Sequence, residues 1–442
     1  MKRLFASVAF AISCVFTQQT DALAANHFVS PSGTGVDGSN WKKAWKSPSD
    51  IDWTKVNAGD QILLDGGTAG VTYNASIIVP KSGAQGAPIT IRQSPQAGHN
   101  GPITFYGGAT TGAVGLDNAI LIQGSFINII GAQRGGIKIN AYKVACVNIA
   151  GTGTNNINVK NIYMDNRVTS PPYGSTSSVG LRYSGYNNRI LDCDFRNSTA
   201  GAREIYTAGV ENLTVFNRCS FGCDRFCDGW QRGASGDSIL GVNNADASFK
   251  STTHVRNSAF GPYVSFGLRV YSGTWSVADC LFLNSNTAGI YMDPLAVSPP
   301  NVRVNQCTFY KAGTPTPPYM ISNFPIYNNT GVGTLKVKNS IVYGGTMRVP
   351  AEMNINAGGN FQFRVLGSTT ALAPSQVDPQ FTDDATLSTL PVNFVPRRLC
   401  EVSYAVKSTS PAVGKGSRLL STNELCAPYG FTTPIPMQVG GP

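Results

Sequence analysis

Charged residues are scarce in this sequence. Asp, Glu, Lys and Arg make up only 13% of the 442 residues, whereas glycine occurs 48 times and proline 26 times. Helical bundles are rich in charged helix-forming residues and tolerate little glycine or proline, so this composition argues against a mainly helical architecture. Many short strands joined by tight turns are expected instead.

Long apolar runs and runs of like charge are also lacking. Beyond the amino-terminal leader no stretch is long enough to cross a bilayer as a helix, so we predict no integral membrane segment in the mature chain. The formal net charge of +10 favours an anionic partner. Because the basic residues are scattered, we predict that this partner is a polysaccharide and not a nucleic acid. No feature of the sequence predicts an oligomeric state.

Residues 1–24 have the pattern of a secretory signal peptide. A basic start precedes an apolar core at residues 4–16, and a small-residue cleavage site ends at Ala24. We therefore expect a secreted or periplasmic protein whose mature chain follows Ala24. A lipoprotein anchored through Cys14 is the alternative.

An internal repeat is present between Ile190 and Val342. Six segments each have a β-branched residue, then polar residues, then Cys or Ser, and end in Phe or Val two residues later. A repeat with a period of about 20–50 residues indicates stacked structural units. The Cys or Ser positions, which by subtraction are 26, 39, 22, 27 and 33 residues apart, are Cys193, Cys219, Ser258, Cys280, Cys307 and Ser340.

Equivalent side chains of such a repeat should stack inside a solenoid. The shortest spacing is close to one turn of a parallel β-helix, and longer spacings imply inserted loops. We predict one buried ladder of the Cys and Ser positions and a second ladder of phenylalanines, each contributing roughly 1.5–3 kcal/mol of transfer free energy. The predicted aromatic ladder consists of Phe195, Phe221, Phe260, Phe282 and Phe309.

The ladder accounts for four of the nine cysteines that follow the leader, as small apolar residues. Export favours disulfides, and we predict one between Cys400 and Cys426 in the loop-rich tail, with Cys223 and Cys227 as a second candidate pair. No histidine lies near enough in sequence to Cys219, Cys223 and Cys227 to complete a zinc site, so no metal site is predicted.

The amino-terminal part resembles a known superfamily. Its motifs are Phe28-Val-Ser-Pro-Ser-Gly, Gly38-Ser-Asn-Trp-Lys-Lys-Ala, Ala58-Gly-Asp-Gln-Ile-Leu-Leu and Gly86-Ala-Pro-Ile-Thr-Ile. This order resembles the cap and first coils of secreted right-handed parallel β-helix proteins similar to pectate lyases, a superfamily that includes polysaccharide lyases and glycoside hydrolases.

The resemblance implies an all-β chain, folded as a single-stranded right-handed parallel β-helix or solenoid. We expect a signal peptide at 1–24, an amino-terminal cap at 25–75, the β-helix at 76–345, and the last turns with a carboxy-terminal tail at 346–442. Within the cap, the segment from Trp41 to Val56 is the best candidate for a helix, anchored by its tryptophans.

A β-helix has a filled core, so binding must occur on an outer face. Side chains of a strand alternate between its two faces, which places Arg269 and Tyr271 outward beside the inward Leu268. The same rule makes Glu204 and Tyr206 outward around Ile205. Stacking then predicts an outward strip of Arg182, Glu204, Tyr206, Asp228, Gln231, Arg269, Tyr271, Tyr291 and Asp293, with the neighbouring Trp230 and Arg232 as further candidates for substrate binding.

Within this strip we expect catalysis from Arg269, Tyr271, Glu204, Asp228 and Asp293. The others, namely Arg182, Tyr206, Trp230, Gln231, Arg232 and Tyr291, are expected to bind substrate. Aromatic rings stack on sugars, and arginine binds carboxylates through two parallel hydrogen bonds. No protein cofactor is predicted, although calcium is a further candidate.

Two chemistries fit this strip. A β-elimination needs a base and a cation that neutralises a uronate carboxylate; Arg269 or Arg232 would neutralise, and Tyr271, Lys250 or His254 would be the base. Hydrolysis needs two carboxylates, with Glu204, Asp228 and Asp293 as candidates and Asp237 and Asp246 behind them.

The prediction is a carbohydrate-active enzyme that cleaves an acidic extracellular polysaccharide by β-elimination. A glycoside hydrolase and a non-catalytic polysaccharide-binding or surface-adhesion protein are the alternatives. The Gly-His-Gly element of polygalacturonase-like hydrolases and the Arg-x-Pro-x-x-Arg element of pectate lyases are both absent from the sequence. No catalytic residue can therefore be assigned from the superfamily.

Overall fold

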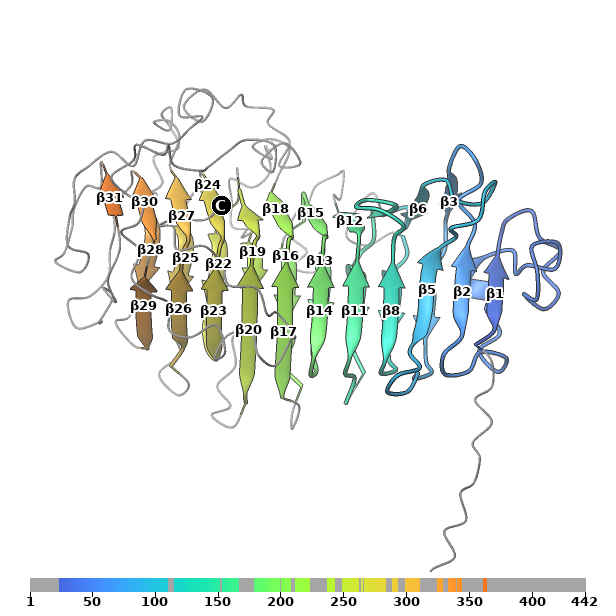
Figure 1. Cartoon of the computed structure of the whole chain (residues 1–442), viewed down its shortest axis with the longest axis horizontal. Coiled ribbons are helices and arrows are strands. Elements are labelled where there is room, and N and C mark those ends of the chain that lie inside the picture. Colours follow the sequence, from blue (N-terminus) through green and yellow to red (C-terminus); the bar gives the residue numbers. More distant parts are fainter. Residues whose placement is uncertain are drawn as a thin grey trace, which may run out of the picture.

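Short parallel strands wind into an elongated solenoid (Figure 1). In this computed structural model the strands form three sheets, A, B and C, and the chain passes from A to B to C before it begins the next coil. The described residues are 24–109, 115–151, 153–166, 179–198, 200–207, 211–222, 237–242, 249–261, 264, 266–283, 288–292, 299–310, 324–328, 333–338, 340–343 and 361–363.

Each strand pairs in parallel with its counterpart one coil away. Sheet A contains β1 (Asn26–Val29), β2 (Gln61–Leu64), β5 (Ile89–Gln93), β8 (Ile127–Ile130), β11 (Ile157–Lys160), β14 (Asn188–Leu191), β17 (Asn212–Asn217), β20 (Ser251–Arg256), β23 (Thr274–Ala278), β26 (Asn301–Asn305) and β29 (Thr334–Lys338). Sheet B contains β3 (Val71–Tyr73), β6 (Ile103–Tyr106), β9 (Ile137–Asn140), β12 (Ile162–Asp165), β15 (Asp194–Arg196), β18 (Ser220–Gly222), β21 (Ala259–Phe260), β24 (Leu281–Leu283), β27 (Thr308–Tyr310), β30 (Ile341–Tyr343) and β31 (Phe361–Phe363). Sheet C contains β4 (Ile77–Val79), β7 (Asn118–Ile122), β10 (Ala145–Ile149), β13 (Val179–Tyr183), β16 (Ala200–Glu204), β19 (Asp237–Leu240), β22 (Phe266–Val270), β25 (Ala288–Met292) and β28 (Phe324–Asn328).

The predicted phenylalanine ladder is present in the core. Phe221 stacks on Phe195 with ring centroids 4.5 Å apart and on Phe260 at 5.0 Å. The stack continues from Phe260 to Phe282 at 4.7 Å and from Phe282 to Phe309 at 4.6 Å. All five rings are buried, so the repeat read from the sequence is the repeat of the coils.

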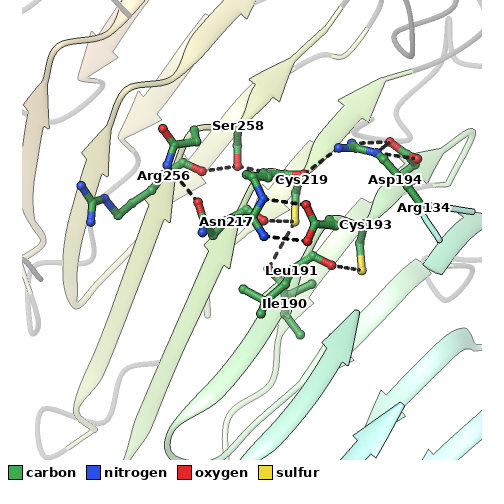
Figure 2. A network of polar contacts seen from close by, with 12 residues as sticks. Arg134, Ile190, Leu191, Cys193, Asp194, Asn217, Cys219, Arg256 and Ser258 are labelled. Carbon is green, nitrogen blue, oxygen red and sulfur yellow. Dashed lines mark hydrogen bonds and ion pairs between the residues drawn. The ribbon is translucent and has the colours of Figure 1, made fainter. Parts of the chain in front are cut away.

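The Cys and Ser ladder is also confirmed, because all of its members are buried. The thiol of Cys193 donates to the Leu191 carbonyl at 3.2 Å, whereas the hydroxyl of Ser258 accepts from the Cys219 amide at 3.1 Å. These contacts, drawn in Figure 2, tie the turn between sheets A and B to the core. Burial raises the pKa of the Cys219 thiol to about 12, so this thiol remains protonated.

The turn between sheets A and B places one residue of each coil in the left-handed region. The amides of the first five residues named below each donate to a carbonyl of the next coil, so the turns stack as regularly as the strands. Arg134 spans several coils here and donates to both carboxylate oxygens of Asp194 (Figure 2). The residues with this conformation are Asn161, Asp192, Arg218, Asn257, Asp279 and Gln306.

The prediction of a cap helix from Trp41 to Val56 is wrong. The described segment forms turns and one short 3-10 helix at Pro48–Asp50. Trp45 instead uses its backbone to extend the edge of sheet A, with its amide donating to the Phe28 carbonyl at 3.0 Å. The tryptophans still anchor the cap, since Trp45 is buried and Trp41 stacks on the His99 ring at 3.9 Å.

The described residues contain no helix that is both long and apolar enough to span a membrane. The predicted signal peptide up to residue 23 and the tail beyond residue 363 lie outside the described residues, as do both cysteines of the predicted disulfide, Cys400 and Cys426. The proposed domain boundaries therefore stay predictions.

Candidate functional site

The outer face of sheet C carries a row of arginine and tyrosine side chains from successive coils. The register pairs Arg182 with Arg203, Arg203 with Leu240, Leu240 with Arg269, and Arg269 with Tyr291. We call these five residues, together with Asn148 beside Arg182, the sheet C row. The row runs across the coils, along the length of the solenoid.

The row faces outward because its sequence neighbours fill the core. Leu181, Ala202 and Leu268 each precede a row arginine and are fully buried. Before each of these apolar residues comes a glycine, and a Cβ atom at Gly201 or Gly267 would lie 2.8 Å from a ring carbon of the phenylalanine ladder. Glycine is needed at these strand positions because the Phe ring occupies the space, so the aromatic core helps to determine which residues of the strand face outward.

Two arginines lie side by side in the row. Arg182 and Arg203 occupy adjacent coils, and both side chains are half-buried. Burial, and then the neighbouring charge of Arg203, hold the pKa of Arg182 below its ordinary value. The lowered pKa means that the protonated form of Arg182 is disfavoured at this position, and a bound carboxylate would stabilise it.

Arg269 is surrounded by aromatic rings. Its guanidinium carbon lies 5.1 Å from the Tyr271 ring centroid, 5.3 Å from that of Phe266 and 5.7 Å from that of Tyr291. The Phe266 and Tyr291 rings also contact each other, with centroids 4.6 Å apart. Cation–π contacts of this kind fix a guanidinium in place, so Arg269 is presented in one orientation on the outer face.

Asp237 lies beside this cluster at the start of β19. Its carboxylate is 3.8 Å from the Arg269 guanidinium and is fully buried. Asp237 also lines a small hollow of about 10 Å³, which is partly open to solvent and which Arg196 and Ser238 also line. Asp237 is thus a buried acid that lies near Arg269 of the row and also borders this hollow.

The outward orientation predicted for Glu204 is wrong. Glu204 pairs with the buried Tyr183 in register and is itself buried. Its carboxylate accepts hydrogen bonds from the Asn212 amide at 3.0 Å, the Val242 backbone amide at 3.2 Å and the Ser251 hydroxyl. Burial raises its pKa, against these three hydrogen bonds. Glu204 ties three strands together at the turn that leaves sheet C.

The other predicted residues are only partly brought together. Tyr291 lies in the row, Tyr271 is buried against Arg269, and Tyr206 packs edge-on against Phe249 with centroids 5.3 Å apart. The candidate base His254 lies on sheet A, a different face, and burial lowers its pKa to about 4. The predicted residues that lie outside the described residues are Asp228, Trp230, Gln231, Arg232, Asp246 and Asp293.

Three residues of the row, Asn148, Arg203 and Leu240, were not predicted from the sequence, and the signal for Arg203 was present there. Arg203 follows Gly201 and Ala202 in the same way that Arg269 follows Gly267 and Leu268. Counting from the glycine, and not from Ile205, would have placed Arg203 outward and Glu204 inward.

Within the described ranges no three His, Cys, Asp or Glu side chains converge as metal ligands would. Asp228 and Asp293 lie outside the described residues. Calcium therefore stays a candidate, and no role is given to it in the site described above.

No protein-family model and no curated protein sequence matches this chain. Among solved structures it is similar to pectate lyase Pel9A, with a TM-score of 0.56 and 15% identity over 90% of this chain and 92% of that one. A rhamnogalacturonan lyase matches with a TM-score of 0.49 and 16% identity, over 72% of this chain and 87% of that one. An alginate lyase from Paenibacillus sp. str. FPU-7 matches with a TM-score of 0.46 and 16% identity, over 73% and 97%. The chain therefore has the right-handed parallel β-helix fold of pectate lyase Pel9A.

Proposed function

We propose that this protein is a secreted polysaccharide lyase that cleaves an acidic polysaccharide by β-elimination on the outer face of sheet C. The observation that carries the proposal is the pair of adjacent, half-buried arginines, Arg182 and Arg203, in one outward row with Arg269. Several cations held along one face suit a polymer with a carboxylate on each sugar.

The chemistry requires that the negative charge on a uronate be stabilised while a proton is removed. A base takes the proton from the carbon next to the carboxyl group, and the resulting enolate-like intermediate is stabilised by positive charge. The electron pair then forms a carbon–carbon double bond as the glycosidic carbon–oxygen bond breaks, and the leaving oxygen takes up a proton. Arg182 and Arg203 would hold the carboxylate of the reacting sugar, and Arg269 that of a neighbouring sugar.

The base is proposed among the residues that share this face. Tyr291 is in the row and half-buried, with its ring near the Arg269 guanidinium, whereas Tyr271 is buried. Tyr291 is therefore the first base to test, ahead of Tyr271. Asp228, Arg232 and Asp293 remain proposed contributors from outside the described residues.

A glycoside hydrolase is the weaker proposal. Hydrolysis requires two carboxylates that flank the scissile bond. Among the described strands of sheet C the acids are Glu204, which points inward, and Asp237, which is buried beside Arg269. The two carboxylates needed for hydrolysis would therefore have to come from Asp228 and Asp293.

The test is to incubate the purified mature protein with polygalacturonate, alginate and neutral polysaccharides. Ultraviolet absorbance of unsaturated products and new reducing ends are followed together. Both signals should rise on a uronate polymer. Arg203→Ala should lower kcat/KM by about 100-fold, as expected for the loss of one charge-stabilising group. Lys138→Ala, which removes an exposed cation from sheet B, should leave kcat/KM unchanged.

Reducing ends without absorbance would overturn the elimination and favour hydrolysis. Retention of a polymer without either signal would favour the non-catalytic polysaccharide-binding protein. Equal activity of Arg203→Ala and Lys138→Ala would show that the reaction takes place away from the sheet C row.

A further inference from the structure

Sheet A has a one-sided charge composition. In its eleven described strands no Asp or Glu occurs. Sheet B, by contrast, carries Asp165 and Asp194 in its strands, and sheet C carries Glu204 and Asp237. The cations in the strands of sheet A are Arg92, Lys160, Arg189, Arg256, Arg303, Lys336 and Lys338.

Three of these cations lie on one line across the coils. The register leads from Arg189 through Val215, His254 and Ser276 to Arg303, and then to Lys336 in the next coil. We call Arg189, Arg303 and Lys336 the sheet A line. The line faces outward because the residues that follow its members, namely Ile190, Val304 and Val337, are buried in the core.

The sheet A line is not neutralised within the described part of the chain, where none of its three members forms an ion pair. Arg303 and Lys336 are exposed and stand directly opposite each other on neighbouring strands. Like charges at such a pair of positions destabilise a sheet. An arrangement that costs stability and has no counter-charge of its own is suited to bind an external anion.

The shape of the line favours a linear polymer. From β14 to β29 there are five strand spacings, or roughly 24 Å at about 4.8 Å each. The strands of sheet A lie side by side along the solenoid in Figure 1, so this length follows the long axis of the molecule. Lys160 lies one coil before β14, where it pairs with Leu191, two residues after Arg189, and it adds a cation beside the same line.

Other anionic partners fit this face less well. Membrane surfaces are bound with apolar side chains as well as cations, but the exposed large apolar residues of the described chain are Val36, Ile78, Tyr106, Leu116 and Tyr186, none of them in a strand of sheet A. Single-stranded nucleic acids are bound through exposed aromatic rings, but Phe216 in β17 and Trp275 in β23 are both fully buried.

We propose that the sheet A line is a second, non-catalytic binding surface for an acidic polysaccharide chain laid along the solenoid axis. It would hold the enzyme on its polymer while sheet C engages another segment. The inference rests on the proposed function only for the identity of the polymer, because binding on sheet A does not require cleavage on sheet C.

The test uses affinity electrophoresis of the full mature chain in gels that contain polygalacturonate or alginate, with a dextran gel as the neutral reference. An Arg203→Ala background is used for both variants, because it should slow cleavage in the gel about 100-fold. The triple variant Arg189→Gln, Arg303→Gln and Lys336→Gln is compared with Lys42→Gln, Lys46→Gln and Lys138→Gln, three exposed lysines of the cap and sheet B whose loss changes the net charge equally.

The sheet A variant should bind the acidic polymer about tenfold more weakly than the control variant, and the difference should shrink at high salt because exposed charges are screened. With Arg203 restored, both variants should cleave short oligosaccharides at the same rate. Equal retardation of the two triple variants in the acidic gels would overturn the inference, even if the protein is a lyase. Conversely, absence of cleavage on every polymer would refute the lyase and leave this binding result intact.

Vesicles of phosphatidylglycerol and duplex DNA serve as competing probes. If either is bound more tightly than both acidic polysaccharides, with the same dependence on the sheet A line, the polysaccharide assignment is wrong. Thermal unfolding of both variants shows whether they are equally well folded. If the sheet A variant is unfolded, the deciding measurement is the retardation, at rising salt, of the folded protein that keeps the sheet A line. Retardation that is unaffected by salt would refute an electrostatic binding surface.

Discussion

Asp192 and Asp279 occupy the same position in the turn between sheets A and B, three coils apart, in opposite electrostatic environments. Both are in the left-handed conformation. Burial raises the pKa of Asp279 to about 6, although Arg256, 3.7 Å away, acts to lower it. Burial would also raise the pKa of Asp192, but two hydrogen bonds from Arg218 and the nearby cations hold it below its ordinary value.

Asp279→Asn should remove a buried carboxylate whose ionisation lowers the free energy of unfolding as the pH rises. Since the pKa of Asp279 is higher in the folded than in the unfolded chain, its contribution to stability is present in acid and is lost as the pH rises toward about 6. Asn fits the left-handed conformation, as Asn257 shows one coil earlier. Between about pH 4 and pH 7, the free energy of unfolding of the variant should gain about 1–3 kcal/mol relative to wild type. Urea unfolding at several pH values measures this, and a constant difference would contradict it.

Asp192→Asn should have the opposite dependence. Because the folded-state pKa of Asp192 is lowered, its ionised form contributes stability above the unfolded pKa, and that contribution is lost as the pH falls. The Arg218 side chain is 50% exposed, so we expect a loss of only about 0.5–1 kcal/mol at neutral pH. The same titration should show this loss vanishing in acid; a variant more stable than wild type at neutral pH would refute the assignment.

Phe260→Ala should destabilise the protein by about 3–5 kcal/mol. Phe260 is fully buried and stacks between Phe221 and Phe282, so truncation opens a cavity within the ladder. Tyr106→Ala is the control, because that aromatic side chain is 41% exposed. Denaturant unfolding measures the free energy of unfolding of both variants. An equal, small loss of stability in the two would exclude a packed ladder at Phe260.

Glu204→Ala should reduce stability and leave catalysis on the folded molecules largely intact. The substitution leaves the Asn212 amide and the Val242 backbone amide without their acceptor in a buried site, which costs about 1–3 kcal/mol for each group. Unfolding experiments and kcat on the folded fraction separate the two effects. A large fall in kcat with unchanged stability would instead assign Glu204 to the reaction.

The buried thiols should be inert until the chain unfolds. Cys146, Cys193, Cys219, Cys280 and Cys307 are free and buried, and only a thiolate is a good nucleophile. Peptide mapping after treatment with a thiol reagent should find these five unmodified in the native protein and modified in denaturant. Rapid labelling of Cys219 without denaturant would show that the core opens there.

The solenoid could be predicted from the sequence because its core repeats in type as well as in spacing. Phe and Cys recur in the same order at Cys193 and Phe195, and again at Cys280 and Phe282, which reflects their stacking across coils. The register was less predictable at single coils. In the segment that begins at Val215, the residue that pairs with the inward Ile190 is Phe216, since an additional residue precedes Cys219.

The cap and the candidate site show why other features of the structure could not be predicted from short stretches of sequence. Tryptophans at helix-like spacing predicted a helix after Trp41, but the free edge of β1 offered hydrogen-bonding partners that a helix would have left unused. At Glu204, alternation counted from Ile205 gave the wrong phase, because Ile205 follows the end of β16, in which Ala202 and Glu204 are buried and Arg203 is half-buried. The strand position is marked instead by Gly201, where a Cβ atom would meet Phe221 of the following coil. Both errors concern contacts with distant parts of the chain.

The stacked register also limits how this molecule can change size. A coil contributes one place to each outward row, so lengthening or shortening the solenoid by a whole coil changes a binding surface by one strand spacing, about 4.8 Å. Insertion of a single residue within a strand would instead exchange its inner and outer faces. The 22-residue interval from Ser258 to Cys280 is the shortest in the repeat, and it is therefore the natural unit for duplication or deletion when such a surface is fitted to polymers of different repeat length.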